Sequence, residues 1–600
     1  MKTLKIHSSF LILLFVAQHS SLNAQVVINE FSASNLNQYV DDHSDYEDWI
    51  ELFNAGGSSV NLTGYYLSDD SLQNTKWKFP TGTSITANGF IRVWASNRNV
   101  SVGANYHTNF SIKQTKNNPE YVVFSDASGV RIEVIRITPK RKTQLGHSYG
   151  RTANGGVTWG VFKTPTPNAS NNSATSYIGY ADKPDFGLIA GFYPTAQTLS
   201  ITTTEPSSSI RYTTNGTLPT AASPAYTAAI NVTSTQVVKA ITISANSNVL
   251  PSFIEFATYF INSTHTLPVV SIAGDNLDVL ANGDKAQKPL GSFEYFNVNK
   301  QRTANTYGGF NSHGQDSWSS SQRSLDFASR DEMGYNHSIE EVLFNTSPRN
   351  NYQKIILRAA GDDNYPADHQ TSNLGSAHVR DAFVHNLSVH GKLNVDVRRG
   401  SKCVVYLNGQ YWGVYDLRDN PDDHDNTSFY YGQDKYHLYY LETWGTTWAE
   451  YGGPAALNEW SALRTYILGN NMATASNYKY VTDRLDVTGL VDYVLINMFT
   501  VCSDWLNYNT AWWRGTDSTG THLKWGYAIW DNDATFGHYI NYTGIPDTSP
   551  TASPCDPENP VLDDPEDHIG ILVKLRQNPD FNQYYISRQI DLWNTVFSCG

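Results

Sequence analysis

The chain is organised around the stretch from Val501 to Gly537, which begins VCSDWLNYNTAWWRG and ends LKWGYAIWDNDATFG. An apolar, helix-like run, Leu490 to Val501, leads into a polar loop. A strand-like run, Trp525 to Trp530, leads into a second polar segment. Carboxylate and amide side chains therefore follow two regular elements, which is how proteins hold Mg²⁺ for phosphate chemistry.

The spacing of these polar residues narrows the interpretation. Asp504 and Asn509 have the D-x-x-x-x-N spacing of a kinase catalytic loop, in which the Asp accepts the substrate proton and the Asn holds a metal. Asp531 and Asp533 follow a strand and precede Phe536-Gly537, as a metal-holding Asp of a kinase would. The alternative is that Asp504 and Asn509 are turn formers and that Asp533 caps the segment after it.

Composition points to an exported, β-rich protein. The 600 residues suggest about four domains, and only 16% are charged while 13% are aromatic. The net charge of −14 and the lack of a basic run argue against a nucleic acid partner. Met1 to Ala24 reads as a signal peptide. No other stretch approaches ~20 apolar residues, so we expect no transmembrane segment and a secreted or cell-surface protein cleaved near Ala24.

The chain has four cysteines, Cys403, Cys502, Cys555 and Cys599, none in C-x-x-C spacing. That spacing argues against a zinc site built from cysteine. One or two disulfides would be compatible with an oxidising compartment, but their pairing cannot be read from the sequence. We expect Cys502 to be buried support rather than a nucleophile, because no base is fixed beside it.

Residues 25–165 predict a β-sandwich of short strands bounded by Gly, Asn or Pro. The phrases INEFSASN, DWIELFN, LTGYYLSDD and KWKFP resemble the lamin-tail domain, an immunoglobulin-like sandwich, which implies binding or spacing rather than chemistry. An acidic cluster within it either holds Ca²⁺ or is a solvated loop. Its members are Asp41, Asp42, Asp45, Glu47 and Asp48.

Residues 166–180 predict a linker, and residues 181–262 a second all-β unit in which Asn215-Gly216 predicts a hairpin turn. The phrase IRYTTNGTLPT resembles the small β-sandwich at the C-terminus of chitobiases and hexosaminidases. That family usually carries Asp where this chain has Asn215. The resemblance implies either glycan binding or a passive spacer, and no glycosidase activity.

Residues 267–600 mix strands and helices, with a hairpin closed by Asn408-Gly409. The phrases LNGQYWGVYDLRD, HVRDAF, ILRAAGDD, SDWLNYN and WDNDATFG resemble the CotH kinase family, an atypical, secreted protein-kinase-like fold first associated with spore-coat proteins. The whole chain is then expected to be two N-terminal immunoglobulin-like sandwiches followed by an α+β atypical protein-kinase-like domain. An ending soon after a helical run, 584–597, is abrupt for the family, so we expect a truncated domain.

The resemblance implies roles for individual residues. Asp504 matches the catalytic base, while Asn509 and Asp531 match the metal ligands, with Asp533 a candidate second ligand. The family's phosphate-contacting lysine falls at Arg323, within QRSL. Arginine keeps the charge in a longer, planar group.

Other charged residues near these motifs have less specific roles. The strand after the hairpin ends LRD where LRE is commoner, which makes Asp419 a candidate nucleotide-site acid. Arg358 and Arg380 are expected to form ion pairs with Asp362, Asp363 or Asp381, with phosphate contact as the alternative. His313 is expected to be a solvated polar residue.

Three functions remain open at this stage. The first is an extracellular protein kinase that transfers the γ-phosphate of ATP, with Mg²⁺ or Mn²⁺, to Ser or Thr of a secreted or surface protein. The second is a degenerate surface adhesion or scaffold protein that binds partners without transfer, which the replacement of Lys by Arg323 favours. The third is transfer of another nucleotide-derived group, such as AMP.

Overall fold

The computed structural model describes residues 25–114, 119–315, 318, 320–364, 376–536, 538 and 564–598. The expected signal peptide, Gly537, Cys555 and Cys599 lie outside these residues. The chain divides into two compact units. Unit 1 comprises residues 1–112, 121–136 and 148–175, and unit 2 comprises residues 113–120, 137–147 and 176–600.

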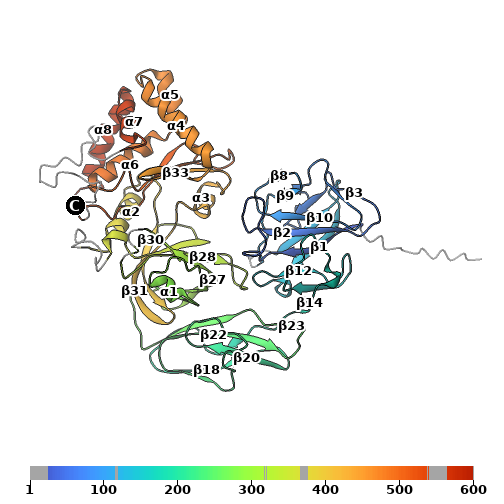
Figure 1. Ribbon diagram of the computed structural model, residues 1–600. Helices are drawn as coiled ribbons and strands as arrows, with labels where there is room; N and C mark the ends of the chain where they lie inside the picture. Colours follow the sequence, from blue (N-terminus) through green and yellow to red (C-terminus); the bar gives the residue numbers. More distant parts are fainter. Residues whose placement is uncertain are drawn as a thin grey trace, which may run out of the picture. The chain divides into compact units, whose positions relative to one another are not determined.

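Unit 1 is all β, as its alternating sequence predicts (Figure 1). Its larger sheet has the strand order β13-β12-β1-β2-β7-β9-β8, and a second sheet has the order β11-β10-β4-β5. The bounds are β1 (Val26–Ser32), β2 (Asp48–Asn54), β3 (Val60–Asn61), β4 (Tyr66–Ser68), β5 (Trp77–Lys78), β6 (Ser84–Ile85), β7 (Phe90–Ala95), β8 (Ser101–Val102), β9 (Asn105–His107), β10 (Glu120–Ser125), β11 (Arg131–Ile137), β12 (Ser148–Arg151) and β13 (Trp159–Phe162).

Hydrogen bonds fix the segment after β13, which the sequence predicts to be a linker. Asn171 is buried, and its side-chain Nδ2 donates to the backbone carbonyl of Arg151 at 2.8 Å. Its Oδ1 accepts from the side-chain Nδ2 of Asn29 at 3.3 Å. This part of unit 1 is therefore tied to the strands of its larger sheet.

Unit 2 begins with a small β module. Its main sheet has the order β17-β24-β22-β20. The bounds are β14 (Ser176–Tyr177), β15 (Gly179–Tyr180), β16 (Asp185–Phe186), β17 (Gly191–Tyr193), β18 (Gln197–Leu199), β19 (Ile201–Thr202), β20 (Ser208–Thr213), β21 (Ile230–Val232), β22 (Gln236–Ser244), β23 (Val249–Leu250) and β24 (Glu255–Ile261).

The tight hairpin predicted at Asn215-Gly216 is wrong. β20 pairs antiparallel with β22, which begins well after Asn215-Gly216 in the sequence. An isolated antiparallel bridge joins Arg211 to Ala225 across the loop that contains the dipeptide. The Asn215 side chain instead accepts from the Thr217 amide at 3.3 Å and from its hydroxyl at 2.7 Å. Such local side-chain bonds stabilise a turn without joining two adjacent strands.

A closed barrel follows, with the order β25-β26-β27-β28-β29-β31-β30. Parallel pairing of β25 with β30 closes it. Phe260 of the β module packs against Phe296 and Tyr406 of the barrel, at ring-centroid distances of 5.1 and 4.8 Å. The bounds are β25 (Val269–Gly274), α1 (Leu277–Ala281), β26 (Leu290–Phe296), β27 (Arg302–Ser312), β28 (Leu325–Arg330), β29 (Lys354–Arg358), α2 (Arg380–His390), β30 (Gly400–Leu407) and β31 (Gln410–Arg418).

The turn between β30 and β31 confirms the hairpin predicted at Asn408-Gly409. Both residues have positive φ, 50° and 82°, as the favoured two-residue hairpin turn requires. A Cβ at Gly409 would approach the Cα of Gln236 to 3.1 Å, so the backbones are close here.

The last part of unit 2 is a sheet of order β33-β32-β34-β35 with helices packed around it (Figure 1). Its core includes Trp460, Trp512, Trp525 and Leu572. The bounds are α3 (His424–Tyr431), β32 (Leu438–Trp444), β33 (Thr446–Tyr451), α4 (Gly453–Gly469), α5 (Ala475–Thr482), α6 (Val487–Phe499), β34 (Thr510–Gly515), β35 (Gly526–Ala528), α7 (His568–Leu575) and α8 (Pro579–Asn594).

Two elements predicted from the opening stretch are confirmed, with different ends. The apolar run is α6, whose cap residue Asp486 accepts from the amides of Thr488 and Gly489, as helix N-caps do. The strand-like run contains β35. The C-terminal region is thus a barrel followed by a mixed α and β part, and a kinase-like arrangement stays a prediction. Within the described ranges no helix has the length and apolar character needed to span a bilayer.

Candidate functional site

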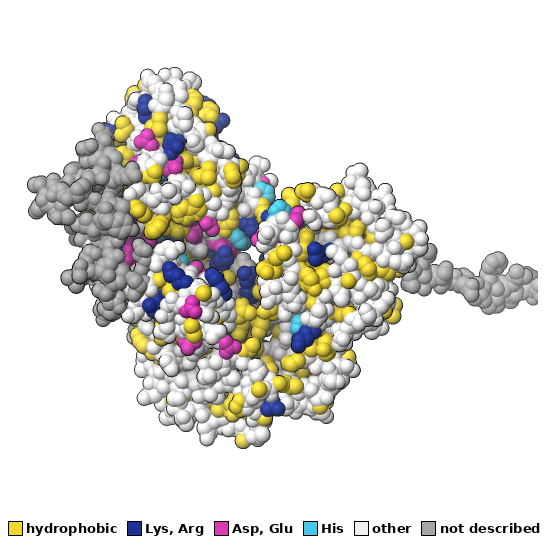
Figure 2. All heavy atoms as spheres, viewed as in Figure 1, with side chains coloured by type: hydrophobic (Ala, Val, Ile, Leu, Met, Phe, Trp, Pro, Cys, Tyr) yellow, Lys and Arg dark blue, Asp and Glu magenta, His cyan; other side chains and the backbone are white. Residues whose placement is uncertain are grey.

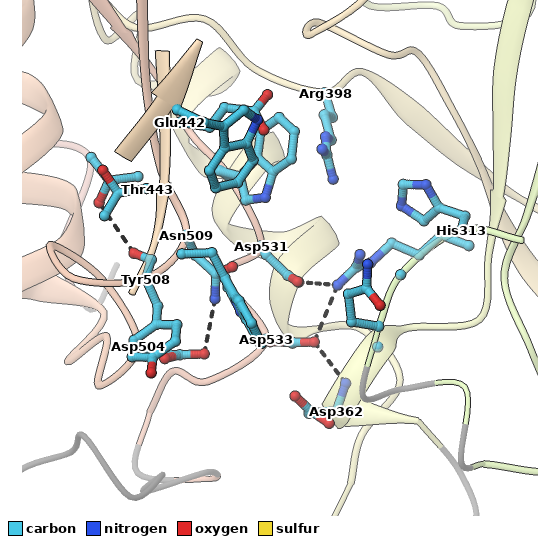
Figure 3. A pocket seen from close by; sticks show the side chains of 18 residues that line it. His313, Asp362, Arg398, Glu442, Thr443, Asp504, Tyr508, Asn509, Asp531 and Asp533 are labelled. Atoms are coloured by element: carbon cyan, nitrogen blue, oxygen red, sulfur yellow. Dashed lines mark hydrogen bonds and ion pairs between the residues drawn. The ribbon is translucent and has the colours of Figure 1, made fainter. Parts of the chain in front are cut away.

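The loops after α6 and β35 meet at a cavity of about 250 Å³ in unit 2 (Figure 3). On the face shown in Figure 2, acidic and basic side chains gather in a hollow between the barrel and the helix-rich part of this unit. The cavity is lined by His313, Gly314, Gln315, Arg358, Gly361, Asp362, Arg398, Glu442, Thr443, Trp444, Trp448, Asp504, Tyr508, Asn509, Thr510, Trp530, Asp531 and Asp533. Asp504, Asn509, Asp531 and Asp533, predicted as catalytic or metal-binding, are thus brought together.

The backbone of these loops adopts an unusual conformation. Val501, Leu506, Asn509, Asp531 and Phe536 all have positive φ, between 44° and 73°. This region is uncommon for non-glycine residues and an outlier for a β-branched one such as valine. Such strain persists only where the surrounding structure imposes it, and it gathers at functional sites.

Asp504 and Asn509 face each other across their loop. The Asn509 Nδ2 donates to Asp504 Oδ2 at 2.8 Å (Figure 3). This bond fixes the orientation of both side chains, because the amide nitrogen must point at the carboxylate. The amide oxygen of Asn509 is then directed away from Asp504.

Asp531 and Asp533 share a buried arginine, Arg358, at the end of β29. One terminal nitrogen of Arg358 contacts Asp531 Oδ1 and lies 3.1 Å from Asp533 Oδ2 (Figure 3). The same Asp533 oxygen accepts from the Asp362 amide at 2.7 Å. Arg358 therefore holds both predicted metal ligands in place.

Gly361 makes this approach possible. It has a φ of +58°, and a Cβ there would lie 2.1 Å from Asp533 Oδ2 and 2.5 Å from an Arg358 nitrogen. Real Cβ atoms do not approach other atoms so closely. A side chain at this position would displace the Asp533 carboxylate or the guanidinium.

Burial shifts the charge states of these groups. Burial, helped by the neighbouring carboxylates of Asp531 and Asp362, raises the pKa of Asp533 well above its usual range, although Arg358 opposes the shift. Burial alone would lower the pKa of Arg358, but Asp531, Asp381 and Asp533 outweigh it and raise that pKa. Arg358 is therefore a permanent cation beside a carboxyl that ionises with difficulty.

A second layer of ion pairs supports the loop that carries these carboxylates. Asp381, on α2, accepts from the Asn532 amide at 2.6 Å, lies 3.6 Å from Arg358 Nε and contacts Arg418. Burial would raise its pKa, but Arg418, His385 and Arg358 together lower it well below its usual range. The expected pairing of Arg358 with Asp381, and of Arg380 with Asp363, is confirmed.

Sequence reasoning missed Arg398, which lies in the segment between α2 and β30. Its side chain is buried, and its guanidinium stacks on Trp530 at 4.1 Å. Its Nη2 lies 4.0 Å from Asp422 Oδ2, and neither Nε nor Nη2 has a hydrogen-bond partner among the described residues. Glu442, which also lines the cavity, is a buried acid whose pKa is raised by burial and by Asp422 and Glu450, although Arg398 opposes the shift. In the sequence, Arg398 is one of two adjacent arginines in the phrase VRRG before a strand. That pattern is too common to identify a functional residue.

The cavity also has an aromatic wall. Trp444 and Trp448 come from the β32–β33 hairpin, and Tyr508 and Trp530 come from the two site loops. Trp444 and Tyr508 meet edge to face, with ring centroids 5.4 Å apart. Such surfaces bind flat or apolar groups through their ring faces.

Two predicted nucleotide-site residues are not among those lining the cavity. The Arg323 guanidinium donates to the backbone carbonyls of Trp318 at 2.8 Å and Ala281 at 3.3 Å, so these donors already bond to the protein's own backbone. Asp419 is fully buried and pairs with Arg349 at 2.7 Å. Their roles in nucleotide binding stay predictions, and the cations at the cavity are Arg358 and Arg398.

Two other expectations concern His313 and Cys502. His313 lines the cavity and pairs with Asp326 at 3.0 Å, so it is more than a solvated polar residue. Cys502 is free and buried, as expected, and so is Cys403, so these two do not form a disulfide. Burial raises the pKa of both thiols.

The donors at this site fit a hard divalent cation. Two carboxylates, Asp531 and Asp533, line the same cavity as the amide of Asn509, and Mg²⁺ takes oxygen ligands of these kinds while keeping several waters. Asp531 is the more accessible of the two carboxylates, with 29% of its side chain exposed against 2% for Asp533. A metal here would share the two carboxylates with Arg358.

Comparison with known protein families matches three separate parts of the chain. Residues 19–139 match the lamin tail domain, and residues 188–251 match the chitobiase/beta-hexosaminidase C-terminal domain. Residues 310–599 match the family described as CotH kinase protein, which covers all the cavity residues named above. No curated protein matches the chain. The chain therefore matches, in order, the lamin tail domain, the chitobiase/beta-hexosaminidase C-terminal domain and the CotH kinase family.

Proposed function

We propose that the chain is a phosphotransferase that moves the γ-phosphate of ATP to a Ser or Thr hydroxyl of a secreted or surface protein. The observation that carries the proposal is the convergence of Asp504, Asn509, Asp531 and Asp533 on one cavity, from two loops separated in sequence. Their spacing is that of a kinase catalytic loop and a metal-holding Asp. The CotH family match over the same residues supports the proposal.

Asp504 is the residue that receives the acceptor's proton. Asn509 Nδ2 donates to Asp504 Oδ2 at 2.8 Å, which orients the carboxylate at the cavity where the acceptor hydroxyl would bind. In such loose transition states the bond between the γ-phosphorus and the leaving ADP breaks early. The position of Asp504 therefore matters more than a raised pKa of its carboxyl.

Arg358 and Arg398 offset charge on the phosphates. Arg358 is a permanent cation beside Asp531, and Arg398 Nε and Nη2 have no hydrogen-bond partner within the described ranges, although Nη2 lies 4.0 Å from Asp422 Oδ2. A buried guanidinium with open donors matches the fork geometry of phosphate oxygens. We assign them this role at the cavity, where the family resemblance alone pointed to Arg323.

Asp531, Asp533 and Asn509 would hold Mg²⁺ or Mn²⁺, which when bound neutralises phosphate charge. The chain's own contribution is the rigid placement of these donors through Arg358, Gly361 and the Asp362 amide. The aromatic wall, with Trp444 and Trp448 at its rim, supplies a surface for the nucleoside or acceptor and excludes water from it.

The acceptor class follows from the expected export of the chain. The signal peptide stays a prediction, since residues 1–24 lie outside the described residues. The proposed extracellular or surface location depends on that predicted signal peptide. The β domains ahead of the CotH region suit attachment to proteins or glycans. We propose no nucleic acid partner, because the net charge is −14.

A second candidate function is a non-catalytic surface adhesion or scaffold protein. The observation that favours it is the contact of Arg358 with both Asp531 and Asp533. A guanidinium placed between the two carboxylates occupies the position that a metal would need. In such a protein the cavity would bind partners without transferring phosphate.

The test is phosphate transfer by the full chain from ATP labelled on the γ-phosphate, with Mg²⁺ or Mn²⁺ and a Ser/Thr-rich protein acceptor. Asp504→Asn should lower transfer at least a hundredfold. Asp483→Asn, at an exposed aspartate that pairs with Lys479 of α5, is the matched control and should leave transfer unchanged. Transfer that persists in Asp504→Asn would reject the assignment, and no transfer by the folded wild type would favour the scaffold.

A further inference from the structure

Two histidines and an aspartate meet in unit 1, far from the CotH region in sequence. Asp42 and His43 lie in the loop between β1 and β2, and His107 ends β9. One ligand-capable atom of each lies within 4.8 Å of the other two. Ligands of a tetrahedral zinc ion, bound at about 2.1 Å, are roughly 3.4 Å apart. The three side chains are therefore close enough to hold one ion with small adjustments.

The arrangement is held in place from both sides. His107 Nε2 lies 2.7 Å from Asp42 Oδ1, and its other nitrogen, Nδ1, lies 3.0 Å from the Ser96 hydroxyl. Metal-binding histidines are typically fixed by such a partner on the second nitrogen. His43 completes the group, with its ring edge-on to His107 at 5.3 Å.

A turn built by Asp41 presents the two loop residues. Asp41 Oδ1 accepts from the amides of His43 and Asp45 at 2.8 and 2.9 Å. Its other oxygen is buried, accepts no hydrogen bond and lies 3.9 Å from His107 Nδ1. The same oxygen also lies 3.8 Å from Arg98 Nη2, so Asp41 supports His107 from the side opposite Asp42 while facing its own cation.

Two other interpretations fit less well. Asp42, His107 and Ser96 look like a hydrolase triad, but the Ser96 hydroxyl is buried and already accepts from the Arg98 amide. The all-oxygen group of Asp41, Asp45 and Glu47, a candidate for Ca²⁺ from sequence, contains its own cation, because Arg98 contacts Asp45 and lies 3.8 Å from Asp41.

We propose that Asp42, His43 and His107 form a binding site for a zinc-class divalent metal, with its remaining coordination position open to solvent. Imidazole nitrogens with one carboxylate suit Zn²⁺, whereas Ca²⁺ takes oxygen ligands. Asp42 and His43 are exposed, so the ion enters from the surface. The site is independent of the proposed phosphate transfer.

The experiment is titration of the full chain with Zn²⁺ by calorimetry, followed by Co²⁺ for its visible absorption in a nitrogen and oxygen site. We expect one site per chain, an affinity lowered at least tenfold in His43→Ala, and little change in Asp45→Asn. His43 is exposed, so its removal leaves the fold intact, while His107→Gln serves as the second variant with circular dichroism as the folding control.

Each contrary result overturns the proposal. Zn²⁺ binding that is equal in wild type and His43→Ala would place the metal elsewhere. Binding lost in Asp45→Asn but kept in His43→Ala would assign the metal to the acidic group. The lack of a Zn²⁺ site in the folded wild type would also reject it.

Discussion

Removal of the Arg358 guanidinium tests how the cavity is held together. In Arg358→Leu, Asp531 and Asp533 both lose the cation that joins them. Breaking a buried ion pair from one side typically costs 3–5 kcal/mol, since the remaining charge is left buried. Asp381 keeps Arg418 and His385, and Asp531 is partly exposed, so the cost falls mainly on Asp533. We expect a loss of about 3 kcal/mol at a pH at which Asp533 is ionised.

The loss should depend on pH in a defined direction. The folded-state pKa of Asp533 lies above its usual value near 4, so its contribution to stability is full below that value and falls as the pH rises. Without Arg358 that pKa rises further. The stability deficit of Arg358→Leu should therefore be small while Asp533 is protonated in the folded wild type, and should widen as the pH rises through the folded-state pKa of Asp533.

Urea unfolding of the full chain, followed by tryptophan fluorescence, measures the effect, with the unfolding of unit 1 as an internal reference. Arg484→Leu, an exposed arginine stacked on Tyr480, is the matched control and should change stability by less than about 0.5 kcal/mol. Arg358→Leu with Asp533→Asn should recover part of the loss, because both partners are then neutral. A loss below about 1 kcal/mol, or one that is the same at every pH, would refute this reasoning.

Three further predictions follow from single contacts. Gly361→Ala should weaken metal-dependent nucleotide binding at least tenfold, because its Cβ would collide with the Asp533 carboxylate, and binding unchanged by calorimetry would contradict this. Burial raises the pKa of Glu51 to about 8, so unit 1 should lose stability as the pH rises from about 5 to 8, by at most about 1.4 kcal/mol per pH unit. Urea unfolding at several pH values measures this loss, and Glu51→Gln should make the stability of unit 1 depend less on pH. Peptides carrying Cys403 and Cys502 should resist alkylation in the native chain and react after unfolding, as mass spectrometry would show, because burial raises the pKa of both thiols.

Local patterns predicted the local structure well. The apolar run of α6, the strand before Asp531 and the Asn408-Gly409 turn each depend on neighbours in sequence, so they could be read directly. Asn215-Gly216 has the same dipeptide but forms no hairpin, because the strands that flank it in space come from more distant residues. A turn signal alone does not determine which strands pair.

The site was only partly predictable for a related reason. Asp504 and Asn509 are five residues apart, so their spacing revealed them. Arg358 meets Asp531 across 173 residues, and no periodicity in the sequence reports such a contact. The same holds for His107 and Asp42, which are 65 residues apart and become neighbours only when β9 joins its sheet. Long-range pairing, rather than local propensity, decides which charged groups converge.

The central claim is that the cavity of unit 2 binds a nucleotide together with a divalent metal. The most direct measurement is calorimetry of the full chain with a non-hydrolysable ATP analogue, with and without Mg²⁺, beside Asp531→Ala. The account predicts saturable binding that requires the metal and disappears in Asp531→Ala. It also predicts that the analogue at about 100 times its Kd stabilises wild-type unit 2 by roughly 2.7 kcal/mol. Equal binding by the two folded proteins, or no binding by either, would contradict it.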